Sequence, residues 1–138
     1  MTGVQTCALP IYKAACAVGW KRVFRSYSQK WGGGVASIIK KKDSTVYGAA
    51  AYLDKDQIKL LDIYEGVKEG YYEKKKIEIL IEHEGELIPA KAIAYICLSD
   101  EHNKPSKAYL QAIVKTVGEF WKNESGKKIK TSDFDTSG

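Results

Sequence analysis

Cysteine is scarce in this 138-residue sequence, and long apolar runs are absent from it. The cysteines are odd in number and show no CxxC spacing, which argues against a disulfide frame or a zinc site; they are Cys7, Cys16 and Cys97. No apolar run approaches the ~20 residues that span a bilayer. The start of the chain lacks the basic-then-apolar order of a secretory signal. We therefore expect a cytoplasmic protein with no membrane partner.

Arginine is also rare, and this bears on the net charge of +5. Lysines cluster at residues 40–42, 74–76 and 127–128, and such clusters can bind an anionic partner such as nucleic acid. Clustered charge is more often solvated surface. Arginine reads bases better than lysine does, and only Arg22 and Arg25 are present. We expect no nucleic-acid partner.

The first residues differ in character from the rest of the chain. Residues 1–11 read MTGVQTCALPI, with no charge and with neither helical nor strand periodicity. The string resembles the conceptual translation of a sequencing adapter, and Tyr12, whose codons begin with T, fits the base that would follow. We predict that residues 1–11 are non-native and make no contribution to the core. The domain is then expected at 12–122, and the polar residues 123–138 are expected to be a disordered tail.

Patterning divides the domain into strands and helices. Strands are predicted at 18–27, 35–39, 45–53, 71–81 and 86–98, with turns at 41–44 and 82–85. One helix is predicted from Asp54, and a second after its N-cap Ser106. This order favours the α+β class with mostly antiparallel pairing.

The most informative residue is Glu65, at the end of the first helix. Asp54 and Gln57 have capping-box spacing, the helix should end near Tyr64 or Glu65, and Gly66 is the expected C-cap. Ile58 and Leu61 share a helix face with Glu65. Lost hydration and the negative end of the helix dipole both raise the pKa of such a carboxyl, so that it can exchange protons near neutral pH. The alternative is a structural Glu65, turned outward or paired with Lys68 or Lys74.

Several segments resemble the gamma-glutamylcyclotransferase family. Residues 61–72, LDIYEGVKEGYY, resemble its signature of Leu-Asp, two variable residues and Glu-Gly-Val before a Gly and a Tyr. Residues 31–38 resemble its Trp-x-Gly-Gly segment. Further similar segments follow in the same order at 44–53, 92–101 and 105–110. The resemblance covers residues 20 to about 120.

This resemblance implies a small mixed, mostly antiparallel β-barrel with flanking helices. It implies an enzyme that converts gamma-glutamyl amine compounds into 5-oxoproline and a free amine, without metal or organic cofactor. Glu65 would be the general acid and base. The substrate-binding residues would be Tyr72, Tyr95, Tyr109, Trp31 and Gly33. Tyr95 is expected to face inward, because its neighbours Ile93 and Cys97 are apolar. The glycines after Trp31 allow close backbone approach at a pocket, or a simple flexible turn.

The sequence departs from the family in one respect. The family's Tyr-Gly-Ser-Asn loop, whose backbone amides hold the substrate and could stabilise an oxyanion, does not occur in it. We therefore expect an impaired enzyme that lacks part of its pocket.

Other functions remain open. The substrate could instead be a gamma-glutamyl amine such as isopeptide lysine, or glutathione, and a non-catalytic small barrel that binds an acidic partner through its lysines is a further alternative. His83 and His102 are isolated, without a second ligand at metal spacing. The sequence predicts no oligomeric state.

Overall fold

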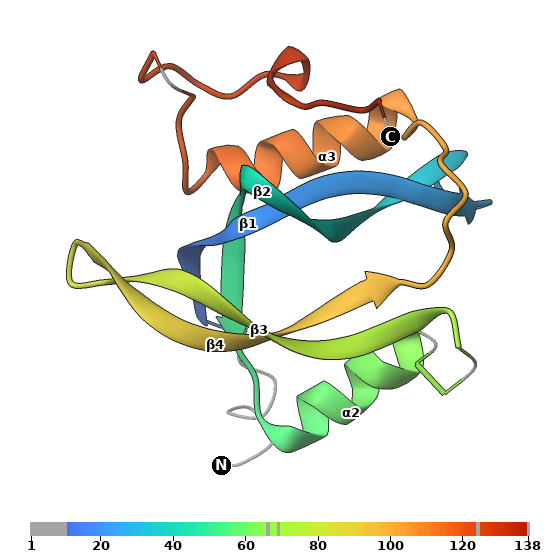
Figure 1. Ribbon diagram of the computed structural model, residues 1–138, viewed down its shortest axis with the longest axis horizontal. Coiled ribbons are helices and arrows are strands. Elements are labelled where there is room, and N and C mark those ends of the chain that lie inside the picture. The colour runs from blue at the N-terminus through green and yellow to red at the C-terminus, as the bar shows by residue number, and fades with distance from the viewer. Residues whose placement is uncertain (1–10, 66, 69, 124, 138) are drawn as a thin grey trace, which may run out of the picture.

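The computed structural model describes residues 11–65, 67–68, 70–123 and 125–137. Its elements, in chain order, are β1 (Ile11–Ser28), β2 (Gly33–Tyr52), α2 (Lys55–Tyr64), β3 (Tyr72–His83), β4 (Glu86–Cys97), α3 (Lys107–Gly118) and a short 3-10 helix, η1 (Thr131–Asp133). The strands form a four-stranded sheet in the order β2-β1-β3-β4. Helix α3 lies beside β1 and β2, whereas α2 lies beneath β3 and β4 (Figure 1).

The α+β class and the antiparallel pairing are confirmed, since every strand pair of the sheet is antiparallel. The sheet is not closed into a barrel, however. Among the described residues, the edge strands β2 and β4 share no ladder, and they meet where the Cys97 N–H donates to Ser37 Oγ at 2.9 Å. The predicted barrel is therefore an open, curled sheet.

Strands β1 and β2 are longer than the sequence suggested. The predicted turn at 41–44 is a bulge inside one continuous strand, because Val18 pairs with Thr45 while Trp20 pairs with Lys40. Gly19 and Asp43 take the positive φ values of 85° and 68° that this bulge requires. β1 also begins at Ile11, which pairs with Tyr52, so the predicted non-native segment reaches into the strand by one residue. Residues 1–10 lie outside the described residues.

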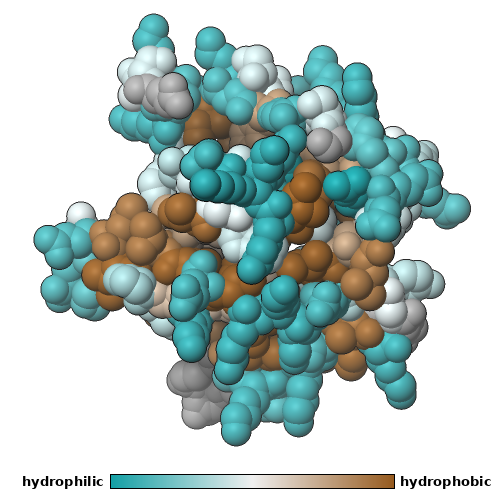
Figure 2. Space-filling view, viewed as in Figure 1, coloured by the Kyte–Doolittle hydropathy of each residue, from teal (hydrophilic) through white to brown (hydrophobic). Residues whose placement is uncertain are grey.

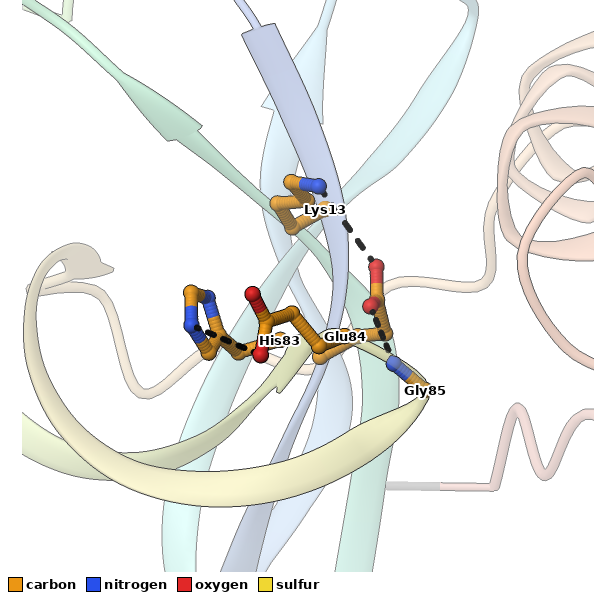
Figure 3. A network of polar contacts seen from close by, with 5 residues as sticks. Lys13, His83, Glu84 and Gly85 are labelled. Atoms are coloured by element: carbon orange, nitrogen blue, oxygen red, sulfur yellow. Dashed lines mark hydrogen bonds and ion pairs between the residues drawn. The ribbon is translucent and has the colours of Figure 1, made fainter.

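The hairpin between β3 and β4 was placed correctly. Glu84 and Gly85 form its tip with φ values of 51° and 83°, as a type I′ turn requires at both central positions. The Glu82 carboxylate accepts a hydrogen bond from the Gly85 N–H at 3.1 Å and lies 3.7 Å from Lys13 Nζ, which joins the tip to β1 (Figure 3). The exposed His83 side chain lies beside Glu84, with its Nε2 atom 3.9 Å from Glu84 Oε2.

The core lies on one face of the sheet. Its buried members come from β1 and β3, where alternate residues share a face: Ala15, Ala17, Trp20, Ile77, Ile79 and Ile81. Phe24 is fully buried, at 0% exposure. Apolar side chains also gather in a band across the middle of the surface in Figure 2, at the level of β3 and β4. Within the described residues, no helix is both long and apolar enough to cross a membrane.

The C-terminal segment packs against the domain, which differs from the expected disordered tail. Ile129 is buried, Phe134 stacks on the Arg22 guanidinium at 5.0 Å, and Asp135 lies 3.2 Å from Lys21 Nζ. The segment runs past α3 at the top of Figure 1. The polar composition of this segment suggested disorder. Its contacts are with Lys21 and Arg22 of β1, which are distant in sequence, so a local pattern could not predict them.

Candidate active site

Helix α2 places Glu65 as the sequence predicts. The Gln57 N–H donates to Asp54 Oδ1 at 2.7 Å, and the Asp54 N–H donates to Gln57 Oε1 at 2.8 Å, so the capping box is formed. Glu65 follows the last helical residue, and its N–H donates to the Leu61 carbonyl at 2.8 Å. The expected C-cap, Gly66, lies outside the described residues.

The predicted apolar stripe of α2 is the half-buried face of the helix. Ile58, Leu61 and Glu65 are all half-buried. Leu60 and Tyr64, at neighbouring positions of the helix, are exposed at 68% and 77%. The half-buried face of the helix is therefore narrow.

The Glu65 carboxyl is half-buried and has no ion-pair or hydrogen-bond partner among the residues that the structure describes. Lys74, one partner considered from the sequence, binds Asp62 instead, at 2.8 Å. Burial raises the pKa of Glu65, because a carboxylate there loses hydration and gains no countercharge. The helix dipole acts in the same direction.

Tyr72 and Tyr95 lie on the face of the β3–β4 hairpin that is opposite the apolar core. Tyr72 pairs with Cys97, and Lys74 pairs with Tyr95, whereas the alternate residues of β4 pack against the core: Ala90, Ala92, Ala94 and Ile96. Tyr95 therefore shares a face with Ile93 and Cys97, but this is not the face that packs against the apolar core. The Tyr95 side chain is half-buried there, whereas Ile93 is 40% exposed. Short side chains such as alanine fill the core here, so apolar character did not reveal the buried face.

Besides burial, the charge of Glu65 raises the pKa of both tyrosines. Burial raises the pKa of Tyr72 above its usual range, and Coulomb interactions with Cys97 and Glu65 act in the same direction. Burial, the hydrogen bond to Asp62 and the Glu65 charge raise the pKa of Tyr95 in the same way. Both hydroxyls therefore keep their protons at neutral pH.

Asp62 is a site residue that the sequence analysis did not single out. It lies one helical turn before Glu65, where it accepts hydrogen bonds from the Tyr95 hydroxyl at Oδ1 and from Lys74 Nζ at Oδ2. These bonds hold the pKa of Asp62 below its usual range, chiefly through Lys74. Its position three residues before Glu65, on the same face, was the available signal.

Tyr109 reaches the site from the first turn of α3. The Ser106 hydroxyl caps this helix, as predicted, by accepting from the Tyr109 N–H at 3.2 Å. The Tyr109 hydroxyl accepts from the Ala36 N–H of β2 at 2.9 Å. Burial raises the pKa of Tyr109, the bond to Ala36 opposes this, and the Glu65 charge raises the pKa further. Tyr72, Tyr95 and Tyr109 thus all lie within electrostatic reach of one carboxyl.

Trp31 and Gly33 support Tyr109. The Trp31 ring packs edge-to-face on the Tyr109 ring, with centroids 5.1 Å apart. Gly33 is buried against the segment that leads into α3, and a Cβ added to it would lie 2.6 Å from Ser106 N and 2.8 Å from Lys104 O. The close backbone approach allowed by the glycines is thus made with the chain itself. Contact of either residue with substrate remains a prediction.

The hydroxyl groups of Tyr95 and Tyr109 have opposite hydrogen-bonding roles. Tyr95 donates its only hydroxyl proton to Asp62, so its oxygen can only accept a further hydrogen bond. Tyr109 accepts from Ala36, and its own proton has no acceptor among the described residues, so it can donate to a ligand. The site can therefore offer a donor and an acceptor around a carboxyl that can exchange a proton. Among the described residues, no group of His, Cys, Asp and Glu side chains is placed to hold a metal ion.

Comparison with known proteins agrees with this fold. Residues 45–119, more than half of the chain, match the AIG2-like family. The protein belongs to this family, and the resemblance to gamma-glutamylcyclotransferases found in the sequence is confirmed.

Two curated relatives cover part of the chain. The mouse and human proteins named gamma-glutamylcyclotransferase are 33% and 31% identical to it over 86 residues, which are 62% of this chain and 44% of each relative. The chain thus matches less than half the length of these relatives.

Solved structures share the fold. A protein described as a gamma-glutamyl cyclotransferase superposes with a TM-score of 0.76 at 24% identity, over 96% of this chain and 78% of that one. YkqA from Bacillus subtilis gives a TM-score of 0.67 at 16% identity, over 88% of this chain and 53% of that one. At these identities the likeness concerns the fold alone.

Proposed function

We propose that this protein is a cyclotransferase that converts gamma-glutamyl amino acids or amines into 5-oxoproline and releases the free amine. The observation that carries the proposal is the half-buried Glu65 carboxyl, which lacks a countercharge among the described residues and whose charge acts on the pKa of three tyrosines. Burial without a fixed partner gives a carboxyl a pKa suited to proton exchange. The names of the mouse and human relatives support the same reaction.

The chemistry asks little covalent help from the protein. The α-amine of the substrate attacks its own γ-amide carbonyl carbon, a new C–N bond closes the five-membered ring, and the old C–N bond breaks. Because the nucleophile is intramolecular, the protein mainly needs to hold the chain in a folded conformation. Glu65 would take a proton from the α-ammonium group and pass it to the departing amine, so that one carboxyl acts first as base and then as acid.

The tyrosines would orient the substrate around Glu65. Tyr109, whose hydroxyl proton has no acceptor in the described part of the chain, suits the carbonyl oxygen or the substrate carboxylate, both of which accept hydrogen bonds. Tyr72, held at the start of β3 across from Cys97, would contact the substrate from the hairpin side. Trp31 and Gly33 would act by fixing Tyr109.

We further propose that the chain as written turns over slowly. The Tyr-Gly-Ser-Asn motif, which the family resemblance assigns to substrate binding, does not occur in the sequence. Each missing oxyanion donor costs ~2.7–4 kcal/mol at analogous sites, whereas a general acid–base contributes ~10²–10⁴-fold, so Glu65 alone cannot compensate.

The test is release of 5-oxoproline from gamma-glutamyl-alanine, gamma-glutamyl-lysine and glutathione. The chain as written is compared with a version that carries the upstream residues of its gene. We expect measurable turnover in the extended version and at least about a hundredfold less in the chain as written. Equal turnover in both would refute the impairment, and no 5-oxoproline from any substrate in the extended version would refute the proposed reaction.

A further inference from the structure

The Asp62 carboxylate joins three elements at the candidate site. Its two oxygens bind a pair of residues that lie directly opposite each other, Lys74 on β3 and Tyr95 on β4, while Asp62 itself belongs to α2. The Asp62 side chain is 25% exposed and that of Lys74 is 36% exposed, so water competes only partly for these bonds. The arrangement fixes the Tyr95 hydroxyl on Asp62, within the range of the Glu65 charge.

The geometry points to Asp62 as a positioning residue that makes the Tyr95 oxygen a hydrogen-bond acceptor for the substrate's α-ammonium group. This inference rests on the proposed function. A tyrosine hydroxyl has one proton, and at Tyr95 that proton goes to Asp62 Oδ1. A lysine ammonium can only donate, so Lys74 holds the other Asp62 oxygen and leaves Oδ1 for Tyr95. The Tyr95 oxygen then presents lone pairs to any donor at the site.

The α-ammonium group is the donor that suits this oxygen. It carries N–H protons and a positive charge, and both Tyr95 and Glu65 would favour it: the tyrosine as acceptor, the carboxylate as countercharge and base. A substrate analogue without this amine would lose the interaction. Asp62 would therefore select for gamma-glutamyl compounds with a free α-amine, without touching the substrate itself.

Asp62→Asn changes the polarity of this network with little change in shape. Lys74 can only donate, so the amide oxygen of the new side chain would face Lys74 and the amide NH₂ group would face Tyr95. The Tyr95 oxygen would then accept from the amide, and its proton would turn toward the site. The Tyr95 hydroxyl would then present a donor to the α-ammonium group, whereas in the unaltered chain it presents an acceptor.

The experiment measures binding by NMR of tyrosine labelled at Cζ, with the Tyr95 signal identified from Tyr95→Phe. The ligands are gamma-glutamyl-alanine and glutaryl-alanine, which has the same skeleton without the α-amine. In the unaltered chain, we expect gamma-glutamyl-alanine to bind more tightly and to shift the Tyr95 signal. In Asp62→Asn, its affinity should fall roughly 10–100-fold, the range for one hydrogen bond to a charged group, while that of glutaryl-alanine should stay within about threefold.

A matched control separates this role from a general effect on α2. Asp56→Asn removes the same charge from an exposed position on the same helix and should leave the selectivity unchanged. Should Asp62→Asn unfold, Asp62→Ser, too short to reach Tyr95, is expected to lose the selectivity in its place.

The outcomes distinguish the inference from the proposed function. Retention of the ligand selectivity in a folded Asp62→Asn or Asp62→Ser variant would overturn the role of Asp62 alone. Equal affinity of the unaltered chain for the two ligands would also overturn it. If gamma-glutamyl-alanine produces no response in the unaltered chain, the inference fails; if the extended version also gives no turnover, the proposed function fails with it.

Discussion

Gly33 should be essential to the packing that positions Tyr109. In Gly33→Ala, the new Cβ would lie 2.6 Å from Ser106 N, about 0.8 Å short of the 3.4 Å at which ordinary contact begins. The atoms it would meet, Ser106 N and Lys104 O, belong to the backbone, so no side-chain rotation can relieve the clash. Overpacking of this kind costs about 1–3 kcal/mol. For a domain of this size that loss lowers the Tm by about 3–12 °C.

Thermal unfolding followed by circular dichroism measures this loss, and Gly48→Ala is the matched control. Gly48 lies on the same strand, β2, and an added Cβ there meets nothing within 4 Å. That substitution should be neutral or stabilise by up to about 1 kcal/mol, because alanine loses less backbone entropy on folding. Gly33→Ala should also weaken ligand binding, since Ser106 caps the helix that carries Tyr109. Equal melting temperatures for the two variants would refute the packing role of Gly33.

Three further outcomes follow from the burial and charge of single residues. Glu65→Gln should raise the Tm at neutral pH and leave it unchanged near pH 4. The pKa of Glu65 is higher in the folded than in the unfolded chain, so its ionisation lowers the stability only as the pH rises above the unfolded-state pKa. The same difference in Tm at both pH values would contradict this origin. Phe24→Ala should cost about 3–5 kcal/mol in urea unfolding, because Phe24 is fully buried, and a cost below about 1 kcal/mol would contradict that burial. Phe134→Ala should cost about 0.5–1 kcal/mol through its lost stacking on Arg22, and an unchanged stability would show that the C-terminal segment does not rest there in solution.

Local patterns predicted the helices and the hairpin well. The capping box of Asp54 and Gln57, the Ser106 cap and the turn at Glu84–Gly85 each depend on residues that are close in sequence, so their geometry follows from local chemistry. The antiparallel α+β class followed from the order of these elements. The bulge at Gly19 depends instead on the registry of two long strands, and no local signal distinguishes it from a turn.

The candidate site, like the fold, could be predicted only in part from the sequence. Glu65 could be predicted from helix periodicity, and the family resemblance supplied Tyr72, Tyr95 and Tyr109. Their common neighbourhood depends on contacts between α2, β3, β4 and α3, which a single sequence does not specify. Asp62 was missed for the same reason, since its partners Lys74 and Tyr95 come from other elements.

The most direct test of the account is the effect of Glu65→Gln on 5-oxoproline release from gamma-glutamyl-alanine, measured in the version with the natural upstream residues. The control is Glu73→Gln, which neutralises an exposed carboxylate on β3. We predict that Glu65→Gln lowers kcat by about 10²–10⁴-fold while ligand binding persists, and that Glu73→Gln leaves kcat within about twofold. Retained turnover in a folded Glu65→Gln variant would contradict the central claim that Glu65 carries the proton.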